Sequence, residues 1–407
     1  MTTTDVNLLQ RRVLRTLMIG QLLSGFGVGV VVSIGALLAE KLSGTPAWAG
    51  AGATFSTLGT AVWAFPLARL ASNRGRRVAL VTGSSIAVSG ALLSVLAGIS
   101  GWFPLLLVGY FALGAASAIS LQARFAATDL PSVRHSGRDI ALVVWGTTIG
   151  AVIGPNLFGP GEALGNLLHL PHLTGPFLIT VMAQIAGSTA FLIGLRPDPL
   201  LTARSLDASK TGLKPKVSLG AAFSVLRTNP KARFAVLAIA LSHMVMVAVM
   251  SMTTVHMEGM GFDLVVVGIT ISLHVAGMYA VSPLFGWLAD RWGRMPMIII
   301  AQLVLLSALL FTWLGDMDRT SLSIGLLLLG LGWSAATVSG SALLTDAVTG
   351  ADKPNVQGLS DALQSLSGAL GGAVAGVVLA AVMYSGLSVI AMVPVAAVLL
   401  LALRQRR

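Results

Sequence analysis

The chain of 407 residues contains no cysteine. Disulfide bonds and thiolate metal ligands are therefore excluded, and any metal site must use methionine, histidine or carboxylate side chains. The sequence also lacks a phosphate-binding loop of the Gly-x-x-x-x-Gly-Lys-Ser/Thr type, and it shows no evident pairing of a nucleophile with a base. ATP-driven pumping and enzymatic catalysis are accordingly unsupported, and no cofactor is expected.

Charge is also scarce, since Asp, Glu, Lys and Arg make up 10% of the chain against 55% hydrophobic residues. This composition is typical of a membrane protein. Twelve apolar runs approach or exceed the ~20 residues that cross a bilayer as a helix, so the sequence predicts an all-α membrane protein. The predicted spans are 15–39, 47–70, 78–99, 102–126, 138–160, 174–195, 231–257, 262–289, 297–315, 320–345, 356–383 and 385–403.

The basic residues collect on one side of this topology. Of 26 lysines and arginines, only Lys41 and Arg319 fall in the loops of the other side. Because Lys and Arg are enriched in cytoplasmic loops, both termini are predicted to be cytoplasmic and the protein to lie in the cytoplasmic (inner) membrane. This topology and anionic lipid explain the net charge of +11, so we expect a lipid bilayer and a small substrate as partners, no nucleic acid, and a monomer.

The hydrophilic stretch after residue 195 divides the spans into two sets of six. We predict an N-terminal bundle at 1–195, a cytoplasmic linker at 196–230 and a C-terminal bundle at 231–407. An internal repeat supports the division. Gly75-Arg76 recurs as Gly293-Arg294 at an offset of 218 residues, and Thr128-Asp129 recurs as Thr345-Asp346 at an offset of 217.

The segment GWLADRWGR, residues 286–294, resembles the signature loop of the major facilitator superfamily. The resemblance implies two six-helix bundles around a central cavity and alternating access. In the first copy of this loop, which contains Gly75 and Arg76, Ser72 stands where the family usually has aspartate. The alternative, simple anchoring by arginines on the cytoplasmic side, does not account for the aspartate and the glycines. The predicted gating motif is Gly286, Asp290, Arg291, Gly293 and Arg294, with Gly75 and Arg76 in the first copy.

Span 138–160 carries Gly150, Gly154 and Pro155, which resemble the glycine and proline motif of facilitator antiporters. Glycines four apart allow close helix packing, whether that packing serves a gate or is generic. Span 102–126 is expected to lack the buried arginine that drug/proton antiporters of this superfamily carry, which disfavours drug efflux. Asp361 is either a coupling carboxylate or a solvated interfacial residue.

Methionine and histidine are concentrated between residues 243 and 278. Met246 and Met250 form an i,i+4 pair on one helix face, and His274 and Met278 form another in the next span. Thioether and imidazole ligands together favour Cu(I). The alternative is that the methionines are flexible packing. Further candidate ligands or relay groups in the same stretch are His243, His256 and Met257.

The motifs MVAVM and HVAGM resemble those of the CcoA-like copper importers, a facilitator family marked by Met-x-x-x-Met and His-x-x-x-Met in spans 7 and 8. By that resemblance Met246, Met250, His274 and Met278 bind copper as the transported substrate. The alternative is a carrier for an organic molecule, either riboflavin-like uptake or drug/H⁺ antiport, with methionines and Trp333 lining an apolar pocket. A membrane sensor is a third reading, which we disfavour because no soluble output domain is expected.

Overall fold

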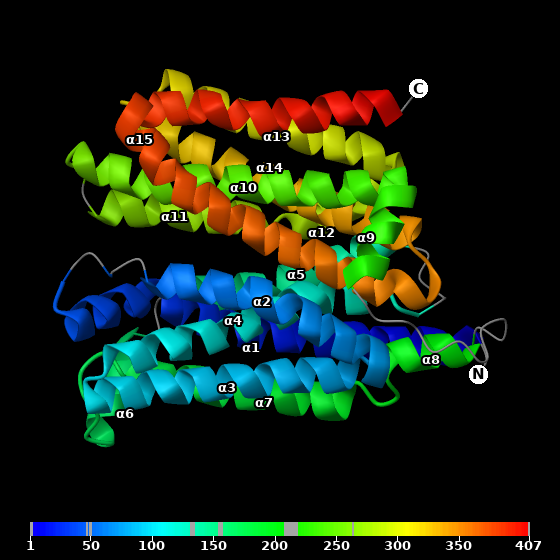
Figure 1. Ribbon diagram of the computed structural model, residues 1–407, viewed down its shortest axis with the longest axis horizontal. Helices are drawn as coiled ribbons and strands as arrows, with labels where there is room; N and C mark the ends of the chain where they lie inside the picture. Colours follow the sequence, from blue (N-terminus) through cyan, green and yellow to red (C-terminus); the bar gives the residue numbers. More distant parts are fainter. Residues whose placement is uncertain are drawn as a thin grey trace. The chain divides into compact units, whose positions relative to one another are not determined.

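The computed structural model describes residues 3–45, 48, 51–130, 135–153, 158–206, 219–262 and 264–405. These residues form helices and connecting turns, with no β-strand among them. In chain order the helices are α1 Thr3–Ser43, α2 Ala51–Arg74, α3 Arg76–Ser100, α4 Phe103–Ala126, α5 Ser136–Ile153, α6 Phe158–Leu167, α7 Gly175–Gly194, α8 Pro199–Leu206, α9 Leu219–Thr228, α10 Pro230–Gly259, α11 Leu264–Tyr279, α12 Ser282–Trp292, α13 Arg294–Leu314, α14 Arg319–Ala347, a 3₁₀ turn Gly350–Asp352, and α15 Lys353–Gln405 (Figure 1).

Within the described residues each of the twelve predicted spans falls on helix, but the helices around α11–α12 and α15 are divided differently from the prediction. The span predicted at 262–289 is interrupted between Tyr279 and Ser282, and Pro283 lies in the first turn of the second piece. Proline suits a first helical turn but has no N–H to continue a helix through it. Conversely, the last two predicted spans form one long element, α15, which bends at Met383 where φ is 65°.

The described chain forms two compact units. Unit 1 comprises Met1–Arg134, Gly146–Phe223 and Gly350–Ala362; unit 2 comprises His135–Trp145, Ser224–Thr349 and Leu363–Arg407. Three helices therefore contribute to both units: α5 starts in unit 2 and continues in unit 1, whereas α9 and α15 start in unit 1 and continue in unit 2. The predicted bundle boundaries at 195 and 231 stay a prediction.

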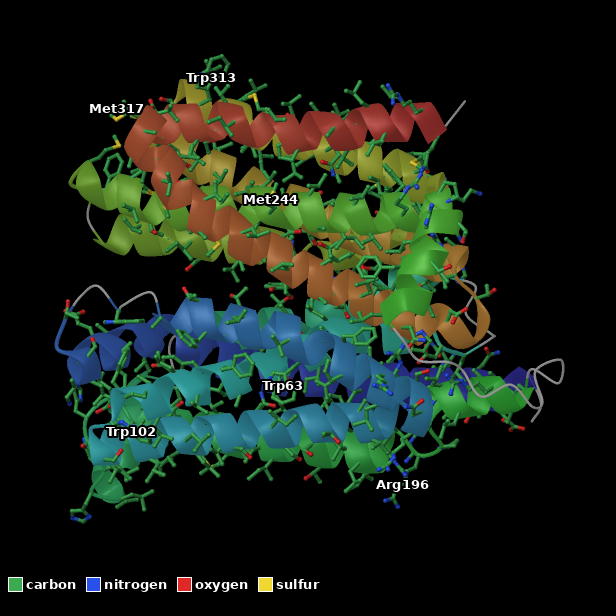
Figure 2. The ribbon with its side chains drawn as sticks, viewed as in Figure 1. Trp63, Trp102, Arg196, Met244, Trp313 and Met317 are labelled. Carbon is green, nitrogen blue, oxygen red and sulfur yellow. The ribbon has the colours of Figure 1, made fainter. Side chains whose placement is uncertain are left out.

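Unit 1 is built from apolar helices that pack through small residues. Trp102 at the start of α4 and Arg196 after α7 lie near opposite ends of this unit (Figure 2). Tryptophan is enriched at membrane interfaces and arginine at the cytoplasmic ends of spans, so this distribution is typical of a membrane-spanning bundle. Gly150 of α5 approaches α1 so closely that a Cβ would collide with the backbone of Leu22 and Gly25.

Unit 2 is organised around α14, along which α10, α11, α12 and α13 all pack. Asp318 caps the start of α14 by accepting a hydrogen bond from the Ser321 backbone N–H at 2.7 Å, which lowers the pKa of this carboxyl. The first limb of α15 runs obliquely beside α10 (Figure 1). Because α14 is central, the helices that carry the candidate histidine and methionine ligands, α10 and α11, both pack against it.

Candidate functional site

The break in the predicted span 262–289 lies directly after the HVAGM motif. His274 and Met278 occupy the last two turns of α11, and the chain turns at Ala280 before α12 begins. Discontinuous helices in transporters occur where the backbone borders a binding cavity, because irregular backbone in a bilayer needs protein or water partners. The Ser282-Pro283 dipeptide was the signal in the sequence, and the prediction of one continuous span missed it.

Glycines let α11 and α14 approach at this point. A Cβ added to Gly330 would lie 3.0 Å from the Met278 backbone nitrogen and closer still to the His274 carbonyl oxygen. Gly277 approaches the backbone of α14 at Leu327 and Leu331 in the same way. Larger side chains would push the two helices apart, so the glycines fix the position of the motif against α14.

His274 is fully buried, and one of its ring nitrogens is hydrogen-bonded to the backbone of α14. Its Nδ1 lies 2.8 Å from the Leu326 carbonyl oxygen of α14. Because a carbonyl only accepts, Nδ1 carries the proton and Nε2 has a free lone pair in the neutral ring. Nε2 is also buried and has no hydrogen-bond partner among the described residues. This is the tautomer that a metal-binding histidine adopts when a carbonyl orients it.

The three predicted thioether ligands lie in one apolar cluster of unit 2. Met246 and Met278 are buried within it, and Met250 is half-buried against it. Met257 and Trp333 belong to the same cluster. Both α10 and α11 pack mainly along α14 rather than against each other. The assignment of these side chains as copper ligands stays a prediction.

Two other histidines of the stretch are engaged with aromatic residues. His243 accepts a hydrogen bond from Trp333 Nε1 through Nδ1 at 2.9 Å. His256 stacks on Tyr384 with ring centroids 4.5 Å apart and donates from Nε2 to the Asp316 carbonyl oxygen at 2.8 Å. Their roles as additional ligands or relay groups stay predictions. Across the described residues, no three His, Asp or Glu side chains come together in a metal-binding group.

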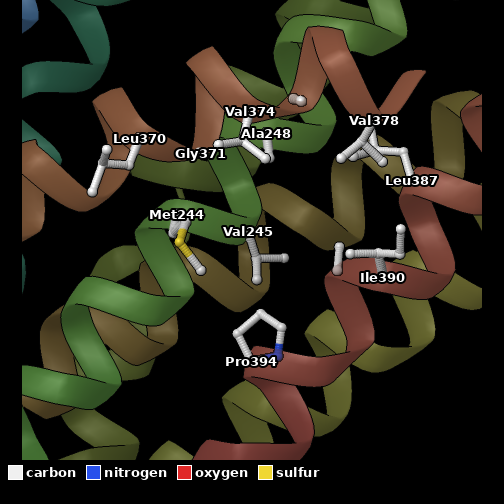
Figure 3. Close-up of a pocket in the computed structure, with 12 residues that line it drawn as sticks. Met244, Val245, Ala248, Leu370, Gly371, Val374, Val378, Leu387, Ile390 and Pro394 are labelled. Atoms are coloured by element: carbon white, nitrogen blue, oxygen red, sulfur yellow. The ribbon is translucent and has the colours of Figure 1, made fainter. Parts of the chain in front are cut away.

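An apolar pocket of about 160 Å³ opens on a different face of α10 (Figure 3). Met244, Val245 and Ala248 of α10 line it together with both limbs of α15. At 100° per residue these positions lie about 100° or more around the helix from Met246. The pocket is therefore separate from the stripe that carries Met246 and Met250.

In unit 2 the predicted gating motif binds the first turn of α5 through hydrogen bonds. Asp290 accepts hydrogen bonds from the backbone N–H groups of Gly137 at 3.0 Å and Arg138 at 2.8 Å, and it pairs with Arg294 at 2.6 Å. Arg294 also reaches Asp346 at 3.2 Å. A carboxylate at a helix N-terminus neutralises unpaired N–H groups and the positive end of the helix dipole.

The remaining residues of the predicted gating motif make contacts within their own unit, and the glycine before the matching helix start has the same backbone conformation in both units. Gly286 meets the Gly137 carbonyl so closely that no side chain fits, and Arg291 lies over the Trp287 ring at 5.3 Å. Gly293 precedes α13 with φ 96°, and Gly75 precedes α3 with φ 92°. Such positive angles favour glycine. In the second motif the predicted Gly150 packs on α1, whereas Gly154 and Pro155 lie outside the described residues.

The corresponding part of unit 1 contains two buried ion pairs. Arg76 pairs with Asp129 at 2.8 Å and donates to Gln357 at 2.7 Å. Arg124 pairs with Asp361 at 2.7 Å, with 2% and 0% of the two side chains exposed. The expectation that span 102–126 lacks a buried arginine is therefore wrong, because the last turn of α4 buries Arg124 against a carboxylate. Asp361 is buried rather than interfacial.

Comparisons with known proteins agree with this architecture. The sequence profile of the Major Facilitator Superfamily matches residues 17–314 and again 264–407. The chain is 37% identical to the uncharacterized MFS-type transporter YdeG of Bacillus subtilis, over 94% of this chain and 89% of that protein. It is 36% identical to the uncharacterized MFS-type transporter YddS of the same organism, over 94% and 88%.

A more distant relative is the riboflavin transporter RfnT of Brucella anthropi, 27% identical over 86% of this chain and 85% of that protein. Among solved structures, the E. coli fucose:proton symporter FucP covers 97% of this chain and 99% of its own, with a TM-score of 0.63 and 16% identity. A bacterial homologue of the iron transporter ferroportin covers 97% and 99%, with a TM-score of 0.70 and 13% identity. These two likenesses support the fold.

The twelve-helix all-α fold predicted from the sequence is thus confirmed, and so is the expectation that the protein is not an enzyme. Eight helical segments of the described chain are long and apolar enough to cross a membrane. The profile match and the relatives identify a multi-pass membrane transporter. The chain belongs to the major facilitator superfamily.

Proposed function

We propose that this transporter imports Cu(I) across the cytoplasmic membrane by alternating access, with Met246, Met250, His274 and Met278 as its ligands. The observation that carries the proposal is the state of His274. Its Nδ1 is bonded to the Leu326 carbonyl, and its buried Nε2 has no partner among the described residues. Burying an unsatisfied acceptor costs free energy, so its retention favours a ligand that binds there.

The surrounding side chains match the chemistry of a soft ion. Met246 and Met278 are buried in the same cluster, and Met250 packs against it. Three thioethers and one neutral imidazole bind Cu(I) well and hard cations poorly. The Leu326 carbonyl orients the imidazole, as hydrogen-bonded carbonyls commonly do for metal-binding histidines. The resemblance of both motifs to the CcoA-like importers supports the same assignment.

The orientation belongs to the proposal as well. Lysine and arginine are concentrated on the side of the chain that contains both termini and the segment between α7 and α10, so we assign that side to the cytoplasm. The site in the middle of α10 and near the end of α11 is then reached by copper from outside and emptied inward. The protein acts as a monomer, and its substrate is not a resident cofactor.

A second candidate is uptake of a flavin-like compound. It is favoured by the similarity to the riboflavin transporter RfnT and by three neighbouring rings in unit 2. Trp333 lies 5.9 Å from His243 and 5.8 Å from Tyr279 between ring centroids. Aromatic platforms of this kind bind planar heterocycles. In this alternative the methionines serve as adaptable apolar lining.

Copper accumulation in cells without high-affinity copper uptake tests the proposal. Cells that produce the protein are expected to accumulate radiolabelled copper, and a variant with alanine at the four proposed ligands is expected to match cells without the transporter. Met297→Ala is the matched control, because Met297 is a fully buried methionine of α13 outside the cluster. If no strain accumulates more copper and cells that produce the protein accumulate labelled riboflavin instead, the flavin proposal replaces the copper proposal.

A further inference from the structure

The apolar pocket beside α10 lies where α15 bends. The two limbs of α15 diverge from Met383, whose φ of 65° turns the chain (Figure 1). Side chains from both limbs and from α10 surround the space between them (Figure 3). Every residue that lines the pocket belongs to unit 2. The pocket is therefore a feature of one unit, separate from the stripe that carries Met246 and Met250.

Small side chains leave this space open. Gly371 brings the first limb of α15 against α10, because a Cβ at this position would lie 2.6 Å from the Met244 carbonyl oxygen. Ala248, Ala375 and Ala391 then line the pocket with single methyl groups. Protein interiors are normally packed without such voids, so an unfilled space of this size favours an occupant from outside the chain.

Helix geometry places the pocket inside the hydrocarbon core of the bilayer. The chain from residue 362 to residue 403 contains no charged residue. Within it, Leu387 and Leu370 are the lining residues nearest to and farthest from the bend at Met383. At ~1.5 Å per residue, they lie about 6 Å and about 20 Å from it along their limbs. With both ends of α15 on the cytoplasmic side, as proposed above, the pocket lies in the outer leaflet and reaches the middle of the core.

The pocket opens toward the lipid. Leu370, Val374 and Ile390, which we call its mouth, are 54%, 55% and 47% exposed. Ala248 and Leu387, which we call its base, are buried. Because this depth of a bilayer holds neither bulk water nor headgroups, the exposed aliphatic side chains of the mouth contact lipid tails. The pocket can therefore be filled directly from the bilayer.

The lining excludes a polar occupant. Its side chains are aliphatic except for the thioether of Met244, so a flavin or another hydrogen-bonding compound would have its polar atoms unpaired there. A single thioether also falls short of a metal site. The volume of about 160 Å³ is below the ~300–1,000 Å³ of pockets that enclose drug-sized ligands. A hydrocarbon chain needs no polar partner and is narrow enough to enter.

We propose that the pocket binds an acyl chain of an outer-leaflet phospholipid. Lipid tails surround the mouth at high concentration and are as apolar as the lining. Binding is therefore driven by packing: a chain in the pocket contacts α10 and both limbs of α15, whereas a chain on an exposed helix face contacts one helix. The bound chain completes the packing between these helices. This inference does not depend on which substrate the protein transports.

Photolabelling of the purified protein in phosphatidylcholine vesicles tests the site. The probe is a phospholipid with a diazirine near the middle of one straight acyl chain, and mass spectrometry identifies the labelled residues. Leu303 and Leu310, exposed on α13 outside the pocket, report lipid at an ordinary helix surface. We expect the base residues Ala248 and Leu387 to be labelled at least as strongly, because only a chain inside the pocket reaches them. Label on Leu303 and Leu310 with none on the base would overturn the proposal.

A filling variant and a control on the same limb make the labelling specific. Ala391→Leu extends a side chain into the pocket and is expected to lower labelling of the base several-fold. Val393→Leu enlarges an exposed side chain outside the pocket and is expected to keep the parent level. Base labelling that Ala391→Leu leaves unchanged would show that the label does not report the pocket, which overturns the proposal.

Competition on the parent protein decides the case if Ala391→Leu does not fold. Unlabelled straight-chain lipid is expected to suppress base labelling several-fold more than lipid with methyl-branched chains of equal length, because branches widen the chain. Equal suppression by the two lipids overturns the proposal. An unlabelled base in a protein that forms dimers in the vesicles would assign the pocket to a second copy of the chain instead.

Discussion

Replacing His274 with glutamine is expected to abolish copper accumulation in cells while leaving the protein folded and in the membrane. Glutamine can still donate to the Leu326 carbonyl, but the imidazole Nε2 that faces no partner among the described residues is lost. Loss of a residue that only orients a metal ligand commonly lowers affinity by about 10–100-fold, and loss of a ligand is expected to cost at least as much. Cu(I) affinity is measured by competition with a chelator.

The control for this variant is His172→Gln. His172 is exposed in a loop of unit 1 and pairs with Glu162. This control therefore also loses one histidine, but it leaves unit 2 unchanged. Copper accumulation by His274→Gln at the parent level, with matched membrane abundance, would remove His274 from the site. A flavin-like substrate is expected to be far less sensitive to this change, because stacking on Trp333 does not need the lone pair of His274.

Replacing Arg76 with methionine is expected to destabilise unit 1 by about 3–5 kcal/mol. The side chains of Arg76 and Asp129 are both fully buried and pair at 2.8 Å. Removing the guanidinium leaves a buried carboxylate without its cation and also takes the donor from Gln357. The free energy of unfolding of the purified protein in mixed micelles measures this effect.

Two further variants make the measurement specific. Arg74→Met removes an exposed arginine on the other side of Gly75 and is expected to change the free energy of unfolding by less than about 1 kcal/mol. The double variant Arg76→Met/Asp129→Leu removes both charges and is expected to recover much of the loss, since an apolar pair can replace a buried ion pair. An Arg76→Met protein as stable as the parent would show that the pair does not hold unit 1 together.

The fold was predictable because a bilayer imposes length and composition on every span. Twelve apolar runs and the repeat of Gly75-Arg76 as Gly293-Arg294 were enough for the architecture, and both glycines are followed by an arginine that pairs with the repeated aspartate. Interruptions of helices were less visible. A single proline, Pro283, ends the continuity of one span, whereas the bend at Met383 has no comparable marker in the sequence.

The residue types of the candidate site could be predicted from the sequence, but the backbone groups of α14 that position those residues could not. Spacing alone places Met246 with Met250 and His274 with Met278 on helix faces. The contribution of α14 depends on tertiary packing: Gly330 admits α11, and Leu326 supplies only a backbone carbonyl, which leaves no trace in a side-chain pattern. Arg124 was missed for a related reason, because one arginine at a span end resembles an interfacial anchor until its partner Asp361 is known.

The central claim is that four side chains of α10 and α11 bind Cu(I), and X-ray absorption spectroscopy of the copper-loaded, purified protein tests it most directly. We expect one Cu(I) for each chain, with sulfur scatterers and a single imidazole in the first coordination shell. The imidazole contribution is expected to disappear in His274→Gln. A protein that retains no stoichiometric Cu(I), or that binds it only through nitrogen and oxygen, would contradict the account.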